Sequence, residues 1–137
     1  MIPDAEKLAV AWAKANGALS ALLQGRVATR LPKGWVSPFL RVVMLPGGDI
    51  DAEADLGTAF LQWDVYAHKP DDDAPDYPTA SLVARTLLHE AQIWTPAAIG
   101  GNGFLYGFGV FRGPGRVEEP DTGWARYMVE MQASIRA

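Results

Sequence analysis

The stretch of sequence that decides the fold is Thr58-Ala59-Phe60-Leu61-Gln62-Trp63-Asp64-Val65-Tyr66-Ala67-His68. Apolar and polar side chains alternate along it with a period of two. The side chains expected on one face are Leu61, Trp63, Val65 and Ala67. Those expected on the other face are Gln62, Asp64, Tyr66 and His68. Such alternation in β-favouring residues predicts a strand with one face against a core.

Four other segments have the composition of strands, two before this stretch and two after it. They are residues 26–30, 39–45, 104–111 and 124–136. The last segment alternates clearly, with Tyr127, Val129, Met131, Ala133 and Ile135 on one face. Gly113-Pro114-Gly115 is expected to end the aromatic strand before it, because proline cannot donate to a central ladder.

Two segments have helical periodicity. Asp4 can cap the first, whose apolar stripe is Ala5, Leu8, Trp12, Ala15, Leu19 and Leu22. Asn16-Gly17 predicts a break inside it in the left-handed region, and Gly25 is expected to end the second piece, after Leu23. The second segment runs from about Pro78 to Ile93, with its stripe at Ala80, Val83, Ala84, Leu87 and Ala91.

These elements predict an α+β fold. We expect two layers, with a mainly antiparallel sheet of about five strands and two main helices packed on one face. A chain of 137 residues fits one domain, spanning 1–137.

The composition narrows the classes of function that this chain can have. The net charge is −4, and the densest basic group, Arg26, Arg30 and Lys33, is better explained as a solvated strand end than as a phosphate-binding patch. Nothing here favours nonspecific DNA binding, which needs clustered cations, and sequence-specific nucleic-acid binding is not expected either. The chain has no cysteine. No apolar run reaches the length of a membrane span, and the first residues do not have the pattern of a signal peptide.

The search for chemistry yields little. Neither His68 nor His89 has neighbouring residues with metal-ligand or catalytic spacing. The acidic loop 49–55 places acids at the first, third and fifth positions of a calcium loop, but Ala54 and Phe60 stand where glycine and glutamate are required. The glycines of 101–107 fail the dinucleotide fingerprint in spacing and context. No enzyme activity, cofactor or metal is therefore expected.

The remaining signal is a set of residues suited to an interface. Three tryptophans lie in or beside connections, and acidic residues crowd two loops. The candidates are Trp35, Trp94, Trp124, Asp49, Asp51, Asp71 and Asp72. The alternative for the tryptophans is that they cover the ends of the sheet.

In its order of elements and the texture of its strands, the chain resembles the tail-terminator, or tail-completion, proteins of long-tailed phages. The resemblance covers nearly the whole chain and lies in residues 4–8, 25–32, 38–42, 61–67 and 124–131. It implies a structural virion protein located in the tail or neck. Its implied partners are further copies of itself in a hexameric ring, the tail tube protein and the head–tail connector, with DNA passing through the ring. A ring is compatible with these elements, because a ring subunit makes head-to-tail contacts and needs adhesive loops and strand edges more than a pocket.

Three other interpretations stay open at this point. Head-completion proteins have a similar size and place in the particle. A small-ligand-binding α+β domain would use the strand 104–111 as a pocket wall. A hydrolase would need a perturbed pair of carboxylates in a cleft, for which the sequence gives no sign.

Overall fold

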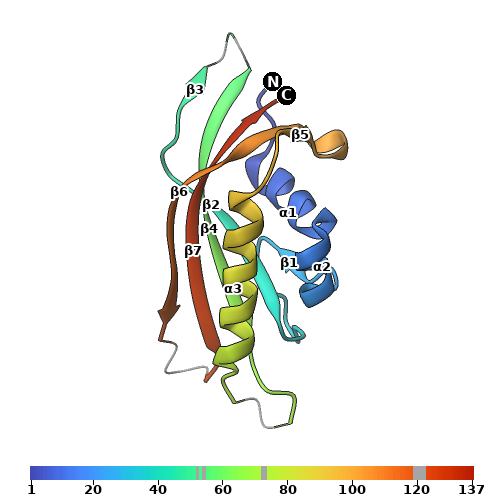
Figure 1. The fold of residues 1–137 in the computed structure, drawn as a ribbon, viewed down its shortest axis with the longest axis vertical. Coiled ribbons are helices and arrows are strands. Elements are labelled where there is room, and N and C mark those ends of the chain that lie inside the picture. Colours follow the sequence, from blue (N-terminus) through green and yellow to red (C-terminus); the bar gives the residue numbers. More distant parts are fainter. Residues whose placement is uncertain (52, 54, 72–73, 119–122) are drawn as a thin grey trace.

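A curved sheet and a layer of helices make up the computed structural model, which describes residues 1–51, 53, 55–71, 74–118 and 123–137 (Figure 1). The helices are α1 (Ala5–Ala15), α2 (Gly17–Leu23) and α3 (Tyr77–Gln92), with a short 3-10 turn, η1, at Gly100–Asn102. The strands are β1 (Val27–Ala28), β2 (Phe39–Leu45), β3 (Ile50–Asp51), β4 (Leu56–Ala67), β5 (Ala97–Ala98), β6 (Phe104–Val117) and β7 (Ala125–Arg136).

The sheet has the order β1-β2-β4-β7-β6-β5, and β3 pairs with the start of β4. Every pairing is antiparallel except that of β1 with β2. The predicted two-layer α+β fold is thus confirmed. Two short strands, β3 and β5, add to the predicted elements.

Strand β4 is the centre of the sheet. It pairs with β7 along its whole length, from Leu56 opposite Arg136 to Ala67 opposite Ala125, and with β2 on its other side. The side chains predicted for its core face are buried, as expected. However, Asp64 and Tyr66 on the opposite face are buried as well, because side chains from neighbouring strands and loops cover them.

The break between α1 and α2 falls where the sequence predicts it, but its geometry differs. Asn16 is extended, with φ −73° and ψ 122°, and its side chain accepts a hydrogen bond from the backbone N–H of Leu19. Asparagine here starts the second helix as an N-cap rather than ending the first in the left-handed region. The left-handed residue is Gln24, at φ 51°, followed by Gly25.

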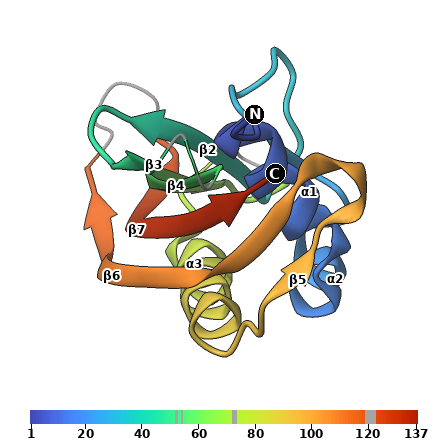
Figure 2. The same ribbon diagram turned by 90° about the horizontal axis from the view of Figure 1, so that it is seen from above.

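The core lies between the helices and the concave face of the sheet (Figure 2). Trp12 of α1 is at its centre, with ring centroids 5.9 Å from Trp63, 4.7 Å from Phe108 and 6.3 Å from Trp94. Edge-to-face arrangements of this kind add to the stabilisation from buried area. Among the described residues, no helix has the length and hydropathy to cross a bilayer.

Strand β6 is longer than predicted. It continues through Gly113-Pro114-Gly115 to Val117, and its register against β7 shifts at three places. The expectation of a break here was wrong. Beyond the first residues, where β5 pairs with it, β6 has no described strand on its outer side, so proline and bulges are tolerated.

Candidate functional site

The two ends of β4 carry the two surfaces on which the predicted interface residues gather. At the C-terminal end of β4, four rings form a cluster that we name the aromatic corner: Trp35, Tyr66, His68 and Trp124. The ring of Trp35 lies 4.6 Å from that of His68 and 5.1 Å from that of Trp124, between centroids. Tyr66 lies within 6.2 Å and 6.4 Å of the two tryptophans.

The loop that carries Trp35 is fastened to the sheet at its end. Arg26 donates from Nε to the carbonyl of Pro38 at 2.9 Å, and the Ser37 hydroxyl accepts from the backbone N–H of His68 at 3.0 Å. Between this loop and the corner is a groove of about 570 Å³. It is lined by Leu31, Pro32, Lys33, Gly34, Trp35, His68 and Trp124.

Beneath the corner lies a buried ionic cluster centred on Asp64, which is 0% exposed. Its Oδ2 accepts from Nη2 of Arg41 at 2.7 Å and from Nε2 of Gln62 at 3.1 Å. Its Oδ1 accepts from Nε of Arg126 at 2.9 Å, and Nη2 of the same arginine lies 2.8 Å away. Both guanidinium groups also lie near the ring of Tyr66, at 5.7 Å and 5.8 Å. A carboxylate can be buried at such a place because charged donors compensate it.

Sequence reasoning missed this cluster. It placed Asp64 on the face opposite Leu61, Trp63 and Val65, which is correct, but it did not place Arg41 and Arg126 beside it. The available signal was an acidic residue in the middle of a strand of large side chains, with Arg41 and Arg126 on strands expected to flank it. Register, which a single sequence does not give, decides that the three meet.

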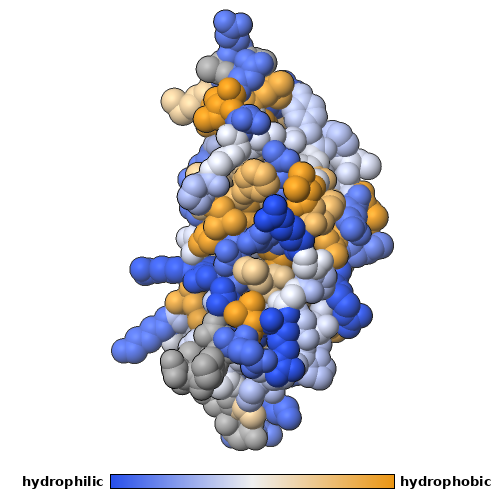
Figure 3. All heavy atoms as spheres, turned by 90° about the vertical axis from the view of Figure 1, so that its left-hand side faces the viewer, coloured by the Kyte–Doolittle hydropathy of each residue, from blue (hydrophilic) through white to orange (hydrophobic). Residues whose placement is uncertain are grey.

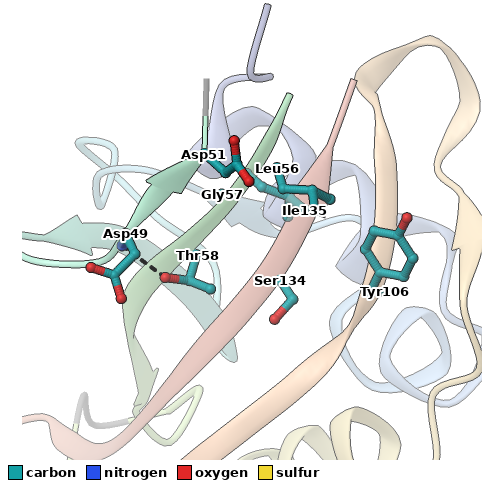
Figure 4. Close-up of a pocket in the computed structure, with 8 residues that line it drawn as sticks. All are labelled: Asp49, Asp51, Leu56, Gly57, Thr58, Tyr106, Ser134 and Ile135. Atoms are coloured by element: carbon teal, nitrogen blue, oxygen red, sulfur yellow. Dashed lines mark hydrogen bonds between the residues drawn. The ribbon is translucent and has the colours of Figure 1, made fainter. Parts of the chain in front are cut away.

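At the opposite end of β4 is an acidic trough of about 300 Å³ (Figure 4). Its lining residues come from β4, β6 and β7 and from β3 with the residue before it: Asp49, Asp51, Leu56, Gly57, Thr58, Tyr106, Ser134 and Ile135. Asp49 and Asp51 stand at one wall and Tyr106 at the other, with Thr58 and Ser134 between them (Figure 4). This surface offers carboxylates and hydroxyls around an apolar floor, which suits a basic side chain with apolar neighbours.

A tight turn positions the acidic wall. Gly47 and Gly48 both have positive φ, at 111° and 94°. After the turn, the backbone N–H of Asp49 donates to the Thr58 hydroxyl, and the Asp49 carbonyl accepts from the Thr58 N–H, each at 2.8 Å. Part of the predicted acidic loop is therefore strand β3, paired with β4.

Large apolar side chains are exposed around the trough. Of the residues that line it, Tyr106 is 40% exposed and Leu56 37%. Ile50, between Asp49 and Asp51, is 72% exposed but lines a neighbouring pocket with Met44 and Gly48. Seen from the side of the sheet, hydrophobic patches alternate with hydrophilic ones along the molecule (Figure 3). Exposed apolar groups next to one sign of charge are typical of a contact surface rather than of a solvated one.

The other predicted residues lie elsewhere. Trp94 packs against the core, and its indole N–H donates to the carbonyl of Leu105 at 3.2 Å, which is the contact of a core-covering residue. Asp71 is exposed in the connection before α3. Asp72 lies outside the described residues. The structure thus brings together Trp35 with Trp124, and Asp49 with Asp51.

Within the part of the chain that the structure describes, no group of three or more His, Asp or Glu residues could hold a metal ion. The ring of His68 packs on Trp35, and its Nδ1 lies 3.0 Å from the carbonyl of Lys69. His89 is exposed on α3.

Comparison with known proteins rests on structure. No protein-family model matches the sequence, and no curated protein matches it. Among solved structures, the fold is similar to that of a chain in the virion of a native gene transfer agent (GTA) particle, with a TM-score of 0.68 and 16% sequence identity. The similarity covers 95% of this chain and 94% of that chain, so the two share one fold from end to end.

Proposed function

We propose that this chain is a structural subunit of a phage-like virion. The observation that carries the proposal is the correspondence of fold over 95% of the chain with a chain of a gene transfer agent virion. A shared fold alone does not fix a function. Here it agrees with a sequence in which we found no catalytic motif and with two contact-like surfaces on the sheet.

Within the virion, the proposed role is that of a tail terminator. Copies of the chain, acting as one domain over 1–137, form a ring that caps the tail tube and joins it to the head connector. Three of the segments on which the resemblance rests fall largely on adjacent strands, 38–42 on β2, 61–67 on β4 and 124–131 on β7, so the resemblance concerns the centre of the sheet. Residues 25–32 lead into the groove beside the aromatic corner.

The ligand-binding alternative has less support. It requires the strand 104–111 to form the wall of an apolar pocket. Instead, Phe108 and Phe111 of that strand pack against the core, and Phe108 contacts Trp12. Tyr106 alone of its aromatic residues lines the trough.

The test is a clean deletion of this reading frame from the particle's gene cluster, followed by negative-stain microscopy of the lysate. Filled heads beside unattached and abnormally long tails establish the terminator role. Unattached tails of normal length indicate a head-completion role instead. Intact, transferring particles overturn the proposal. Expression of the wild-type chain from a plasmid should restore joined particles.

A further inference from the structure

Basic and acidic residues are segregated along the sequence of this chain, although its net charge is only −4. Residues 7–48 contain six basic residues and no acidic one: Lys7, Lys14, Arg26, Arg30, Lys33 and Arg41. Residues 49–55 contain four acidic residues and no basic one: Asp49, Asp51, Glu53 and Asp55. Opposite charges on separate surfaces of one chain are complementary between copies.

Two of these basic residues, Arg30 and Lys33, lie on a projecting loop, residues 29–36, which we name the basic loop (Figure 2). Arg30 and Lys33 are exposed and, among the described residues, take part in no ion pair. Val36 is 60% exposed. Trp35 fixes the base of the loop by packing in the aromatic corner, so the loop is held out from the body rather than folded onto it.

The acidic trough matches the basic loop in chemistry. Asp49 and Asp51 would face Arg30 and Lys33, and Leu56 and Tyr106, which also line the trough, would face Val36 and Pro32. Its volume, about 300 Å³, is at the lower end of that of small-molecule pockets, which is enough for the side chains of a loop tip but not for a helix.

The two surfaces of one molecule cannot meet each other. The basic loop contacts His68, just past the end of β4, whereas the trough lies around Leu56 and Gly57 at its start. Twelve residues of extended strand span roughly 40 Å. Complementary surfaces at opposite ends of one subunit make a heterologous contact, which closes into a ring when the rotation per subunit permits.

The geometry therefore points to a head-to-tail contact in which the basic loop of one copy sits in the acidic trough of the next copy. This inference rests on the proposed role as an assembly subunit, and it names the partner as a second copy of this chain. It also identifies the surfaces that join neighbours in the proposed ring.

Cysteine cross-linking tests the contact directly, because the chain has no cysteine of its own. Val36→Cys and Leu56→Cys replace exposed side chains on the two surfaces and leave all the charges in place. The two variants, mixed under mild oxidation, should form a disulfide-linked heterodimer far faster than either variant forms a homodimer. Val36→Cys mixed with Leu82→Cys, an exposed position on α3, is the matched control. Cross-linking traps brief encounters, so a stable ring is not needed.

Charge reversal then identifies the contact as electrostatic. Arg30→Glu with Lys33→Glu in the Val36→Cys copy should slow cross-linking about tenfold at low salt, and Asp49→Lys with Asp51→Lys in the Leu56→Cys copy should do the same. Combining the two reversed copies should restore the rate. Cross-linking at the control rate, or no rescue by the combination, overturns the contact. Melting curves of all variants must match the wild type.

Failure of this contact and failure of the proposed function give different results. A lysate with unattached long tails together with no specific cross-link keeps the virion role and removes the contact. Specific, salt-sensitive cross-linking together with intact deletion particles keeps the contact and removes the terminator role.

Discussion

Asp64 of β4 and Arg126 of β7 are joined by two close contacts, from Nε and Nη2 of the arginine to Oδ1 of the carboxylate, at 2.9 and 2.8 Å. The carboxylate is fully buried, and Arg41 of β2 holds its other oxygen at 2.7 Å. One acidic side chain thus links three neighbouring strands on the face away from the helices. It also supports Tyr66, which both arginines flank and on which the aromatic corner is built.

The Asp64→Asn variant should lose about 3 kcal/mol of unfolding free energy. The amide keeps the size of the side chain but leaves two partly buried guanidinium groups without their counter-charge, and both keep some contact with water, which limits the loss. Urea denaturation, monitored by tryptophan fluorescence, measures this loss of unfolding free energy. Gln62→Ala, which removes only the 3.1 Å hydrogen bond, is the control and should cost about 1 kcal/mol. Equal midpoints for the two variants would show that the ion pairs add nothing.

Trp35 and Trp124 should be energetically coupled. Their rings are 5.1 Å apart at an angle of 83°, so removing either one leaves the other without its edge-to-face partner. In a double-mutant cycle to alanine, the coupling energy should be about 0.5–1.5 kcal/mol. Trp94→Ala combined with Trp35→Ala is the comparison, and it should be additive because Trp94 packs elsewhere, against Trp12. A coupling energy near zero for the first pair would mean that the corner is not formed in solution.

Long, regular elements were predictable from local pattern alone. The buried face of β4 follows from alternation, strand β2 follows from its composition, and the division of α1 from α2 follows from Asn16-Gly17. What failed depended on partners distant in sequence. The pairing of Ile50 and Asp51 with β4 is too short to leave a pattern. The path of β6 through Pro114 depends on its position in the sheet, which no local signal reports.

The candidate site shows the same division. Residue type correctly singled out tryptophans and acidic residues, but it could not say which of them meet. Trp35 and Trp124 are 89 positions apart in sequence and share one corner, whereas Trp94 lies in the core layer. That outcome is fixed by the register of β4 against β7 and by the attachment of the loop at Ser37.

Substitutions of Asp76 and Asp71 should separate effects on the stability of the chain from effects on particle assembly. Asp76 caps α3, with its carboxylate accepting from the Thr79 N–H at 3.1 Å and from the Thr79 hydroxyl at 2.7 Å. Asp76→Ala should therefore cost about 1–2 kcal/mol in thermal or urea unfolding. Asp71→Ala, in the same connection but exposed, should change stability by less than about 0.5 kcal/mol. If Asp71 contacts a neighbour or the tail tube, its effect should appear in particle assembly alone. A large stability loss in Asp71→Ala would contradict the prediction that this side chain does not stabilise the fold.

Gly48→Ala should distort the acidic trough at the tight turn that positions its acidic wall. Gly48 has φ 94°, which disfavours any side chain, and a Cβ there would collide with the carbonyl oxygen of Thr58. Because the obstacle is backbone, the hairpin must shift, and the paired bonds between Asp49 and Thr58 should weaken. Unfolding free energy should fall by about 1–3 kcal/mol.

The same substitution tests the docking contact without altering a charge. In the Leu56→Cys copy, Gly48→Ala should lower cross-linking to Val36→Cys, since Asp49 and Asp51 would no longer stand in place along the wall of the trough. Gly101→Ala is the matched control, because its Cβ would meet nothing within 4 Å and its backbone is not in the left-handed region. It should behave as the wild type in both assays. A Gly48→Ala copy that loses stability yet cross-links at the full rate would show that the turn matters to the fold but that the shape of the trough does not matter to its partner.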